Sequence, residues 1–386
     1  MIRAAVLTAT RAEYGLMRQL IFKLDKDEEI ELNLLVAGTH LSAAFGMTVN
    51  EIKKDGIPIA GQIDTLVESD GIVNVGATMG KTVAEFDRYF AENKYDFLLV
   101  DGDRYETLMV CIAAINHQIP IVHCGGGATT AGALDDYWRH SITKLSCLHF
   151  ATMELYKKRI IAMGENPENV FCVGSMGIDN IKAMQLAEKC DVEKKIGLQL
   201  DMPYALVTFH PVTVGNVDVE GQTKALLSAC EMMTNMKFIF TKANADKGGY
   251  IINKLLESFV ANHAKSSVCV DSLGAYYYLS AMKYCEFVLG NSSSGIIETP
   301  SFGKPTVNIG DRQKGRERAD SIIDCDVTVE AISAAIQKAR SYEFKNKCIN
   351  VINPNGDGKA SDQIISIIKR VYKCGGFSLS KCFWWE

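Results

Sequence analysis

The sequence has no long apolar run, no excess of basic residues and no paired-cysteine motif. No apolar run approaches the roughly 18 residues of a membrane span. Residues 1–8 have the pattern of a short strand that runs directly into a polar loop. They do not have the layout of a signal peptide. The formal net charge of −5 leaves no basic stripe to hold a phosphate backbone. These absences exclude a membrane-spanning protein and make nucleic acid an unsuitable main partner, so any anion binding must be local.

The twelve cysteines are scattered, and none forms a C-x-x-C pair. Cys111, Cys172 and Cys285 fall in apolar segments where burial is expected. This pattern is typical of reduced thiols and differs from a disulfide framework or a zinc site. The sequence therefore predicts a cytoplasmic protein.

Short apolar strands alternate with helical stretches almost throughout the chain, whose 386 residues are too many for one hydrophobic core. The continuous apolar runs 97–100 and 119–122 predict strands buried on both faces, as in a parallel sheet. The pattern is interrupted at the polar stretch 188–195 and then restarts. The expected strands are Ile2–Thr8, Ile30–Val36, Ile57–Ile63, Phe97–Asp101, Ile119–His123, Leu148–Ala151, Val170–Val173, Tyr204–Thr208, Lys237–Phe240, Val268–Val270, Phe287–Leu289 and Thr306–Ile309.

This alternation predicts an α/β fold of two Rossmann-like, doubly wound domains facing one another, with a ligand between them at the carboxyl ends of the strands. We expect residues 1–175 to form the first domain and residues 176–358 the second. Residues 359–373 should form a closing helix, and the tail 374–386 fits no element. Its Trp384 and Trp385 belong either to a docking patch or to a loosely packed end.

A serine-rich turn follows the apolar run that ends at Gly290, and an apolar helix is expected to begin near Gly295. The backbone N–H groups and positive end of such a helix, together with the hydroxyls of the three serines 292–294, suit a phosphate or diphosphate. Glu298, one turn in, could accept hydrogen bonds from a sugar diol such as a ribose. The alternative is an ordinary capped helix. An Arg-Gln-Lys-Gly-Arg loop that begins at Arg312 favours the anionic ligand.

In the first half, polar side chains follow two predicted strands. Arg11 stands where a dinucleotide fold would place G-x-G-x-x-G, and it offers a charged fork to a diphosphate or, alternatively, pairs with Glu13 at the surface. Asp103 is a candidate acid or base, with Arg104 as a diphosphate or carboxylate partner. The alternative for this loop is an Asx turn that caps the next helix, near Glu106.

Three glycines after another strand are followed by Asp135, Asp136, Arg139 and His140. Glycines without side chains would let a ligand approach the backbone closely. The two aspartates should start a helix, with the guanidinium and imidazole one turn later. Such groups can handle protons on a sugar, although a capped helix with an internal ion pair would also explain the aspartates. In the second half, His210 lies just past a strand end and is either structural or a ligand contact.

Taken together, these segments resemble the hydrolysing UDP-N-acetylglucosamine 2-epimerases of the bacterial sialic and legionaminic acid pathways, which share the glycosyltransferase-B-type fold. The resemblance extends from Arg3 to about Tyr372. The motifs that carry it are Thr10-Arg-Ala-Glu-Tyr-Gly, Gly102-Asp-Arg-Tyr-Glu, Arg139-His-Ser-Ile-Thr-Lys, Phe209-His-Pro, Gly290-Asn-Ser-Ser-Ser-Gly-Ile-Ile-Glu and Gly310-Asp-Arg-Gln-Lys-Gly-Arg.

The resemblance implies that UDP is eliminated from the sugar to leave a glycal, to which water then adds, without a metal or redox cofactor. It also implies a UDP-sugar as the partner and a homo-oligomer. Asp103, Asp135 and His210 would be catalytic, with His210 at the diphosphate or leaving oxygen. The implied substrate-binding residues are Arg11, Arg104, Arg139, His140, Asn244, Ser292, Ser293, Glu298 and Arg312.

The sequence departs from the family at the glycine-rich loop, which typically reads His-Gly-Gly-Glu and often has a second glutamate three residues later. Here Ala128 stands in place of the catalytic glutamate, and Ala131 in place of the second. Three explanations remain open. The chain is a paralogue that acts on another nucleotide sugar through Asp103 and Asp135, a relative that binds without turnover, or a sequence with engineered alanines. A glycosyltransferase of the same fold is a further alternative, which the Arg139-His-Ser-Ile-Thr-Lys segment disfavours.

Overall fold

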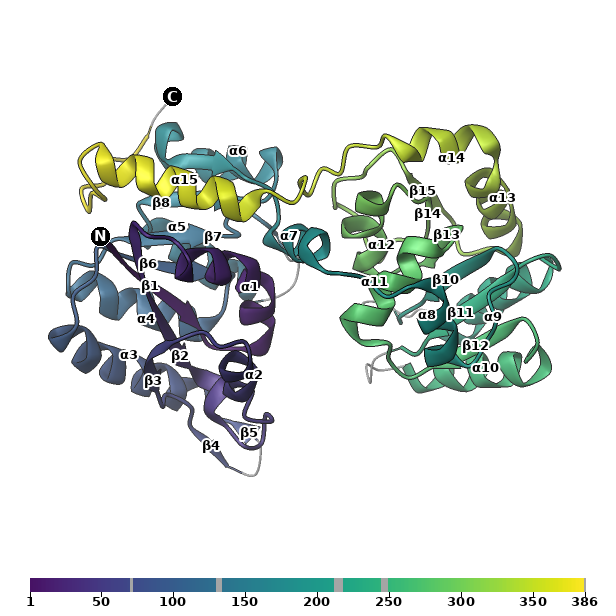
Figure 1. The fold of residues 1–386 in the computed structure, drawn as a ribbon, viewed down its shortest axis with the longest axis horizontal. Coiled ribbons are helices and arrows are strands. Elements are labelled where there is room, and N and C mark those ends of the chain that lie inside the picture. Colours follow the sequence, from purple (N-terminus) through teal and green to yellow (C-terminus); the bar gives the residue numbers. More distant parts are fainter. Residues whose placement is uncertain (70–71, 130–133, 212–217, 244–248, 385–386) are drawn as a thin grey trace. The chain divides into compact units, whose positions relative to one another are not determined.

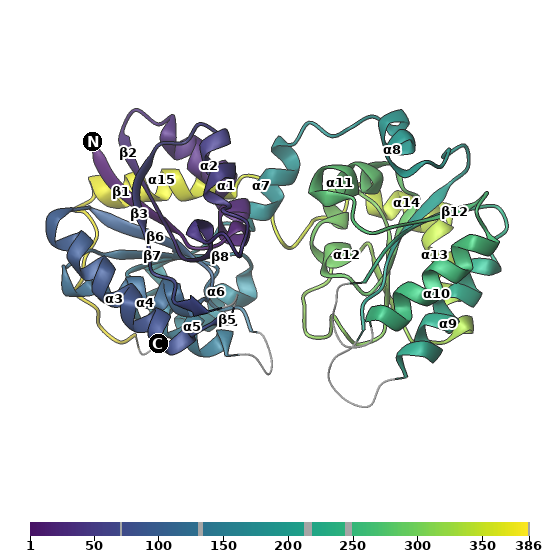
Figure 2. The same cartoon turned by 90° about the horizontal axis from the view of Figure 1, so that it is seen from below.

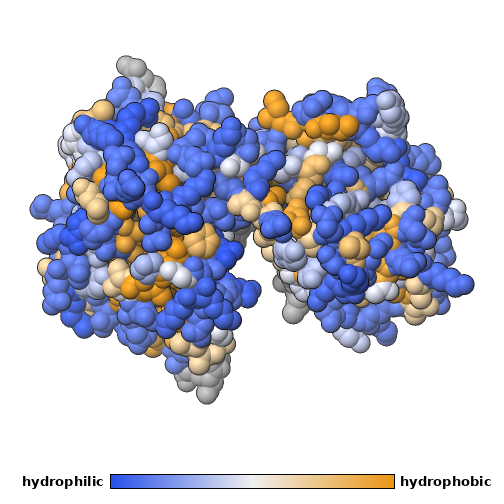
Figure 3. Space-filling view, in the orientation of Figure 1, coloured by the Kyte–Doolittle hydropathy of each residue, from blue (hydrophilic) through white to orange (hydrophobic). Residues whose placement is uncertain are grey.

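The computed structural model describes residues 1–69, 72–129, 134–211, 218–243 and 249–384 (Figure 1). The chain divides into two compact units. Unit 1 comprises Met1–Ala183 and Asn355–Glu386, and unit 2 comprises Met184–Pro354. The face seen in Figure 3 is mostly hydrophilic in both units, with scattered apolar patches, so most of the apolar side chains lie inside each unit.

Within the described residues, unit 1 is built on a seven-stranded parallel sheet with the order β3-β2-β1-β6-β7-β8-β9. Its central strands are buried on both faces, which explains their continuous apolar sequence. The order reverses between β1 and β6, and ligands of doubly wound sheets bind at the carboxyl ends of the strands at such a point. The strands are β1 (Ile2–Thr8), β2 (Ile30–Ala37), β3 (Ile59–Ile63), β6 (Phe97–Asp101), β7 (Ile121–Cys124), β8 (Leu148–Ala151) and β9 (Val170–Cys172).

Helices cover both faces of this sheet (Figures 1 and 2). One core cluster packs α1 and α15 against the sheet, and the other packs α3, α4 and α5 against the opposite face. The helices of unit 1 are α1 (Arg11–Asp25), α2 (Val49–Lys54), α3 (Val75–Glu92), α4 (Tyr105–Asn116), α5 (Asp135–Leu145), α6 (Glu154–Ala162), α7 (Met176–Ala183) and α15 (Ala360–Lys373), with short 3₁₀ turns at Gly38–Leu41 and Pro167–Asn169.

Unit 2 repeats the same plan in its described part, with a six-stranded parallel sheet of order β12-β11-β10-β13-β14-β15. An apolar core lies between the sheet and α9, α10 and α13. The strands are β10 (Tyr204–Thr208), β11 (Lys237–Thr241), β12 (Ser267–Val270), β13 (Phe287–Gly290), β14 (Thr306–Ile309) and β15 (Ile322–Cys325). The helices are α8 (Lys189–Ile196), α9 (Val219–Glu231), α10 (Gly249–Asn262), α11 (Gly274–Tyr284), α12 (Ser293–Ile297), α13 (Val329–Arg340) and α14 (Tyr342–Ile349), with a 3₁₀ turn at Thr299–Phe302.

The expected strands are present, with shifts of one or two residues at some ends. The edge strand β15 and a small antiparallel hairpin, β4 (Glu68–Ser69) with β5 (Ile72–Val73), were not among the expected strands. The division of the chain also differs from the expected boundary at residue 175, because α7 belongs to unit 1 together with α15.

A buried aspartate explains how these two helices join unit 1. The carboxylate of Asp179 in α7 accepts hydrogen bonds from the N–H groups of Ala360 (3.0 Å) and Ser361 (2.6 Å). It therefore caps the first turn of α15 from a position 181 residues earlier in the chain. The last helix thus completes the first unit.

Candidate active site

An ion pair between Asp103 and Arg139 lies at the carboxyl edge of the unit 1 sheet. Asp103 follows β6, and Arg139 comes from the second turn of α5, where 3% of its surface is exposed. The guanidinium also pairs with Asp136 and donates to the carbonyl oxygen of Ala128 (2.9 Å). Arg139 therefore joins the β6 loop, the glycine-rich loop and α5, and the internal ion pair foreseen for this helix is present.

The alternative interpretation of the Asp103 loop, an Asx turn that caps the next helix, is wrong. Helix α4 begins at Tyr105 after Arg104, without a side-chain cap, so Asp103 does not form the capping Asx turn. Arg104 instead donates two hydrogen bonds to the buried Glu106 (2.7 and 3.2 Å). Asp103 remains 30% exposed and available to a ligand.

The other candidate side chains of unit 1 are more exposed to solvent than Arg139. Asp135 is exposed at the first residue of α5, and His140 is half-buried, with no hydrogen-bond partner for Nδ1 in the described part of the chain. Arg11 is exposed at the first residue of α1. The alternative pairing of Arg11 with Glu13 is wrong, because Glu13 is buried and accepts hydrogen bonds from the backbone of Ala9 (2.7 Å) and Thr10 (3.0 Å).

Two buried carboxyl groups beside Asp103 were not among the candidates. Burial, together with the charges of Glu13 and Asp103, raises the pKa of Asp101 to about 8. Burial likewise raises the pKa of Glu13 to about 7, against the lowering effect of its backbone hydrogen bonds. Both groups can hold a proton near neutral pH. Thr10-x-x-Glu13 is a capping box that the sequence does show, whereas the burial of Asp101 depends on the sheet.

The glycine-rich loop needs its glycines partly for packing. Gly127 has a φ of +76°, and a Cβ placed there would lie 2.3 Å from the carbonyl oxygen of Tyr156 in α6. At Gly127, protein backbone occupies the space that a side chain would need, so packing alone requires a glycine there. Ala128, at the position of the family's glutamate, is half-buried next to it.

A pocket of about 380 Å³ lies at the carboxyl ends of the unit 2 strands, at the point where the strand order reverses between β10 and β13. Hydroxyl groups dominate one wall. Thr208 Oγ1 lies 2.7 Å from Thr241 Oγ1 and 3.3 Å from the Tyr278 hydroxyl. The lining residues are Thr208, His210, Thr241, Lys242, Asp271, Ser272, Leu273, Gly274, Ala275, Tyr278, Leu279, Ser292, Ser294 and Glu298.

The serine turn contributes to this pocket through Ser292 and Ser294, while Ser293 is not among the lining residues. Helix α12 begins at Ser293, two residues before the expected start, and has five residues. Ser292 caps it by accepting from the N–H of Ser294 (3.4 Å), and the Ser294 hydroxyl donates to Glu298 (2.6 Å). Burial raises the pKa of Glu298, and the bond from Ser294 counteracts the rise.

Asn291 brings the remaining unit 2 candidates together. Its side chain accepts from the N–H of His210 (2.7 Å) and donates to the His210 carbonyl oxygen (2.8 Å). Its own carbonyl oxygen accepts from Arg312 (3.1 Å) and Gln313 (2.9 Å). The structure thus gathers His210, the serine turn and the Arg312 loop around one buried asparagine. Asn244 lies outside the described residues.

No cluster of three or more His, Cys, Asp or Glu side chains is arranged to hold a metal ion within the described ranges. None of the helices described has both the length and the apolar character needed to cross a bilayer.

Two relatives are similar to this chain over most of its length. A hydrolysing GDP/UDP-N,N'-diacetylbacillosamine 2-epimerase of Campylobacter jejuni is 39% identical over 89% of this chain and 88% of its own. A hydrolysing UDP-N,N'-diacetylbacillosamine 2-epimerase of Legionella pneumophila is 36% identical over 96% of this chain and 97% of its own.

Among solved structures, the Neisseria meningitidis UDP-GlcNAc 2-epimerase bound to UDP-GlcNAc has a TM-score of 0.80. It is 18% identical to this chain, and the match covers 96% of this chain and all of the other. This likeness confirms the predicted class of two Rossmann-like α/β domains, as in the glycosyltransferase-B-type fold. The profile of the UDP-N-acetylglucosamine 2-epimerase family matches residues 22–369. The chain therefore belongs to the UDP-N-acetylglucosamine 2-epimerase family.

Proposed function

We propose that this chain is a hydrolysing 2-epimerase that acts on a UDP-linked N-acetylated hexosamine. The Asp103–Arg139 pair at the edge of the unit 1 sheet is the observation that carries this proposal. A carboxylate held by a buried guanidinium is fixed in direction, as a proton-transfer group must be. Family membership and the hydrolysing epimerases among the relatives at 36–39% identity support the same reaction.

The reaction has two balanced stages. A carboxylate removes the proton from C2, the electron pair of that bond forms the C1=C2 double bond, and the C1–O bond breaks with its electron pair leaving on UDP. Water then adds, with hydroxyl at C1 and a proton at C2 on the opposite face. We assign the proton transfers to Asp103 and Asp135.

The unit 2 pocket supplies the binding half of the proposal. Hydroxyls and backbone N–H groups near Ser292 suit a diphosphate, which neutral donors stabilise without a cation at every oxygen. His210 and Arg312, fixed by Asn291, would contact the departing diphosphate, and Glu298 would accept from the ribose diol. Arg11, Arg104 and His140 keep their assignment to the sugar-nucleotide by resemblance alone, and so does Asn244.

We further propose a 2,4-diacetamido-trideoxy-hexose as the sugar in place of N-acetylglucosamine. The Campylobacter and Legionella relatives named for such a sugar are 39% and 36% identical to this chain. A Neisseria meningitidis relative named UDP-N-acetylglucosamine 2-epimerase is 29% identical.

A UDP-release assay against a panel of UDP-hexosamines, with products identified by proton NMR, tests the proposal. We expect UDP and a C2-inverted free amino sugar from the diacetamido substrate. UDP binding by calorimetry without C2 exchange would instead identify a non-catalytic binder, and release that depends on an acceptor would identify a glycosyltransferase.

The Ala128→Glu variant addresses the position where the family has glutamate. An increase in turnover would show that alanine limits a competent site. A loss of turnover would show that the site works with alanine through Asp103 and Asp135.

We also propose that the enzyme works in the cytoplasm as a homo-oligomer. All twelve cysteines are free thiols, which fits a reducing compartment. Light scattering of the purified protein would measure the number of subunits.

A further inference from the structure

The tail after α15 has no regular structure in its described part, yet side chains anchor it to unit 1. The ring of Phe377 packs 4.8 Å from that of Phe97, centroid to centroid. The N–H of Trp384 donates to the carbonyl oxygen of Gly164 (3.0 Å), and the Phe383 ring lies so close that a Cβ on Gly164 would be 2.5 Å from it. The tail is therefore docked and is not a loosely packed end.

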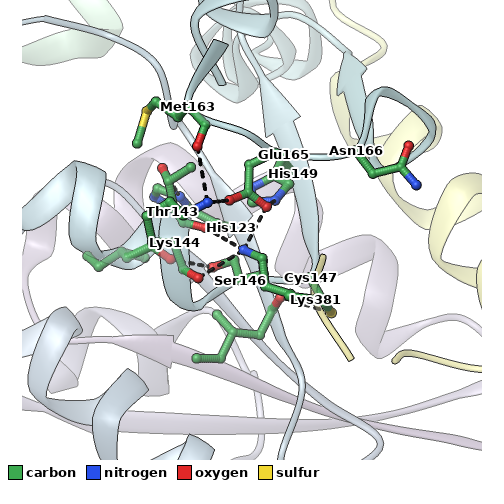
Figure 4. A network of polar contacts seen from close by, with 12 residues as sticks. His123, Thr143, Lys144, Ser146, Cys147, His149, Met163, Glu165, Asn166 and Lys381 are labelled. Carbon is green, nitrogen blue, oxygen red and sulfur yellow. Dashed lines mark hydrogen bonds and ion pairs between the residues drawn. The ribbon is translucent and has the colours of Figure 1, made fainter. Parts of the chain in front are cut away.

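Lys381 is the polar centre of this docking (Figure 4). Its ammonium group donates to the carbonyl oxygens of Thr143 (3.4 Å), Lys144 (2.9 Å) and Ser146 (2.7 Å), at the carboxyl end of α5. The last carbonyls of a helix have no partner within the helix, and a cation there is favoured by the helix dipole. The side chain of Lys381 is 27% exposed. Lys381 therefore caps the C-terminal end of α5, although it lies 235 residues after Ser146 in the chain.

A buried carboxylate holds the ammonium group in place. Glu165 pairs with Lys381 (2.6 Å), and also contacts Lys144 (2.6 Å) and His149 (3.1 Å). Burial raises the pKa of Glu165, but these three hydrogen bonds outweigh it and bring the pKa to about 2. Because Lys144 and His149 would remain, loss of the Lys381 charge would not leave Glu165 without a partner.

The capped end of α5 is connected to the Asp103–Arg139 pair by two short routes. Thr143 is one helical turn after Arg139, and its hydroxyl oxygen lies 3.0 Å from the Arg139 carbonyl oxygen. The same hydroxyl lies 3.2 Å from Nδ1 of the buried His123, whose Nε2 lies 2.9 Å from the carbonyl oxygen of Gly102. Since that carbonyl can only accept, Nε2 carries the proton. Nδ1 and the Arg139 carbonyl oxygen are then both acceptors, and they share the single hydroxyl proton of Thr143.

These contacts lead to a function for the tail that rests on the proposed reaction. We propose that Lys381 is a positioning residue, which caps α5 and thereby holds Arg139 and Asp103 in the geometry required for proton transfer. The first route sets the position of the helix that carries Arg139. The second fixes the backbone at Gly102, next to Asp103. A displacement of about 1 Å at such groups can reduce the rate by up to about 100-fold.

The Lys381→Met variant tests the proposal, because methionine keeps the apolar stem and removes the charge. We expect kcat for UDP release to fall about 10-fold, within that range, with the Kd for UDP unchanged. Lys381→Arg should restore most of the activity, because arginine also donates to carbonyl and carboxylate oxygens. Amide hydrogen exchange should become faster in residues 135–145 of the methionine variant.

Lys373→Met is the matched control, since Lys373 lies just before the tail and makes an exposed ion pair with Glu29 (2.7 Å). It should leave kcat and exchange in α5 unchanged. Any of three results for Lys381→Met would overturn the proposal. These are a wild-type kcat, equal losses of kcat and of UDP affinity, and unchanged amide exchange in residues 135–145. Lys381→Gln, which keeps a donor without the charge, replaces the methionine variant if that protein does not fold.

The outcomes for the tail and for the reaction are distinguishable. If the wild-type protein releases no UDP from any sugar in the panel, the proposed function fails. Faster exchange in residues 135–145 of Lys381→Met would then still establish the cap, and unchanged exchange would refute it.

Discussion

The two units present different chemistry at the same edge of the same kind of sheet. In unit 1 this edge carries charge, with the Asp103–Arg139 pair and the buried carboxyls Glu13 and Asp101. In unit 2 hydroxyl groups dominate one wall of the pocket, whose charged lining residues are the partly buried Glu298 and the ion pair of Lys242 with the exposed Asp271. Proton transfer requires groups that titrate, whereas a diphosphate can be held by neutral donors. Under the proposed function, the charged edge of unit 1 carries the chemistry and the pocket of unit 2 binds the nucleotide.

The largest effect is expected for Asp103→Asn. The amide keeps the shape of the side chain but cannot accept a proton, so kcat for UDP release should fall by about 10² to 10⁴. Calorimetry should show an unchanged UDP affinity, because unit 2 is intact. Asp64→Asn is the control, since Asp64 is 76% exposed in a surface pair with Lys81. A kcat close to the wild-type value would contradict the proposed division of chemistry and binding between the units. A loss of UDP affinity as large as the loss of kcat would contradict it as well.

Asp101→Asn should stabilise the protein increasingly as the pH rises. The folded state keeps a proton on Asp101 up to a pKa of about 8, while the unfolded chain releases it above about 3.8. Stability from this group is therefore present at low pH and is lost as the pH rises through that interval. Asparagine resembles the protonated form and lacks this dependence. The free energy of unfolding of the variant, relative to that of the wild type, should therefore be higher at pH 8 than at pH 5, by up to about 4 kcal/mol.

Urea titrations at both pH values measure this difference. A stability difference that stays constant between pH 5 and pH 8 would show that Asp101 does not titrate as its burial implies.

Glu298→Gln should weaken UDP binding without an equivalent loss of chemistry. Glutamine can still accept from Ser294, but it offers the ribose a weaker acceptor than a carboxylate. We expect the Kd for UDP to rise about 10-fold, or about 1.4 kcal/mol, with kcat at saturating substrate retained. Glu220→Gln is the control, since Glu220 makes an exposed pair with Lys224. A fall in kcat at saturation would instead place Glu298 in the chemistry.

The smallest effect is expected for Thr10→Ala, which removes the cap of α1. The hydroxyl of Thr10 accepts from the Glu13 N–H (3.3 Å), so its loss should cost about 1 kcal/mol and lower the melting temperature. Thr328→Ala removes a similar cap from α13 in unit 2, where the hydroxyl accepts from Ala331 (3.2 Å). We expect Thr10→Ala to lose more stability than Thr328→Ala, because the Glu13 carboxylate also accepts hydrogen bonds from backbone N–H groups at this cap. Equal losses would show that this carboxyl adds nothing to the cap.

Much of the fold could be predicted from the sequence because the central strands are buried on both faces and read as unbroken apolar runs. The edge strand β15 (Ile322–Cys325) escapes this signal, since its burial varies along its length. The sequence likewise gives no local signal that α7 and α15 belong to unit 1. This assignment depends on the buried Asp179, whose partners lie far along the chain.

The site was predictable only as a set of loops. Strand ends identified Asp103 and His210, but the sequence does not show that Asp103 meets Arg139, 36 residues later. The resemblance implied Ser292 and Ser293, whereas Ser292 and Ser294 line the pocket. Lys381 carries no local signal at all, since its partners are backbone carbonyls and one buried carboxylate.

The closure of unit 1 by the end of the chain has a consequence for biosynthesis. Ile364 and Ile368 of α15 are buried in the core against which α1 also packs, so the nascent polypeptide lacks part of that core until residues 360–373 have been synthesised. Unit 2 is continuous in sequence and emerges from the ribosome whole. We therefore expect the later unit to reach its native state first, and the earlier one to expose an apolar groove until its final helix arrives.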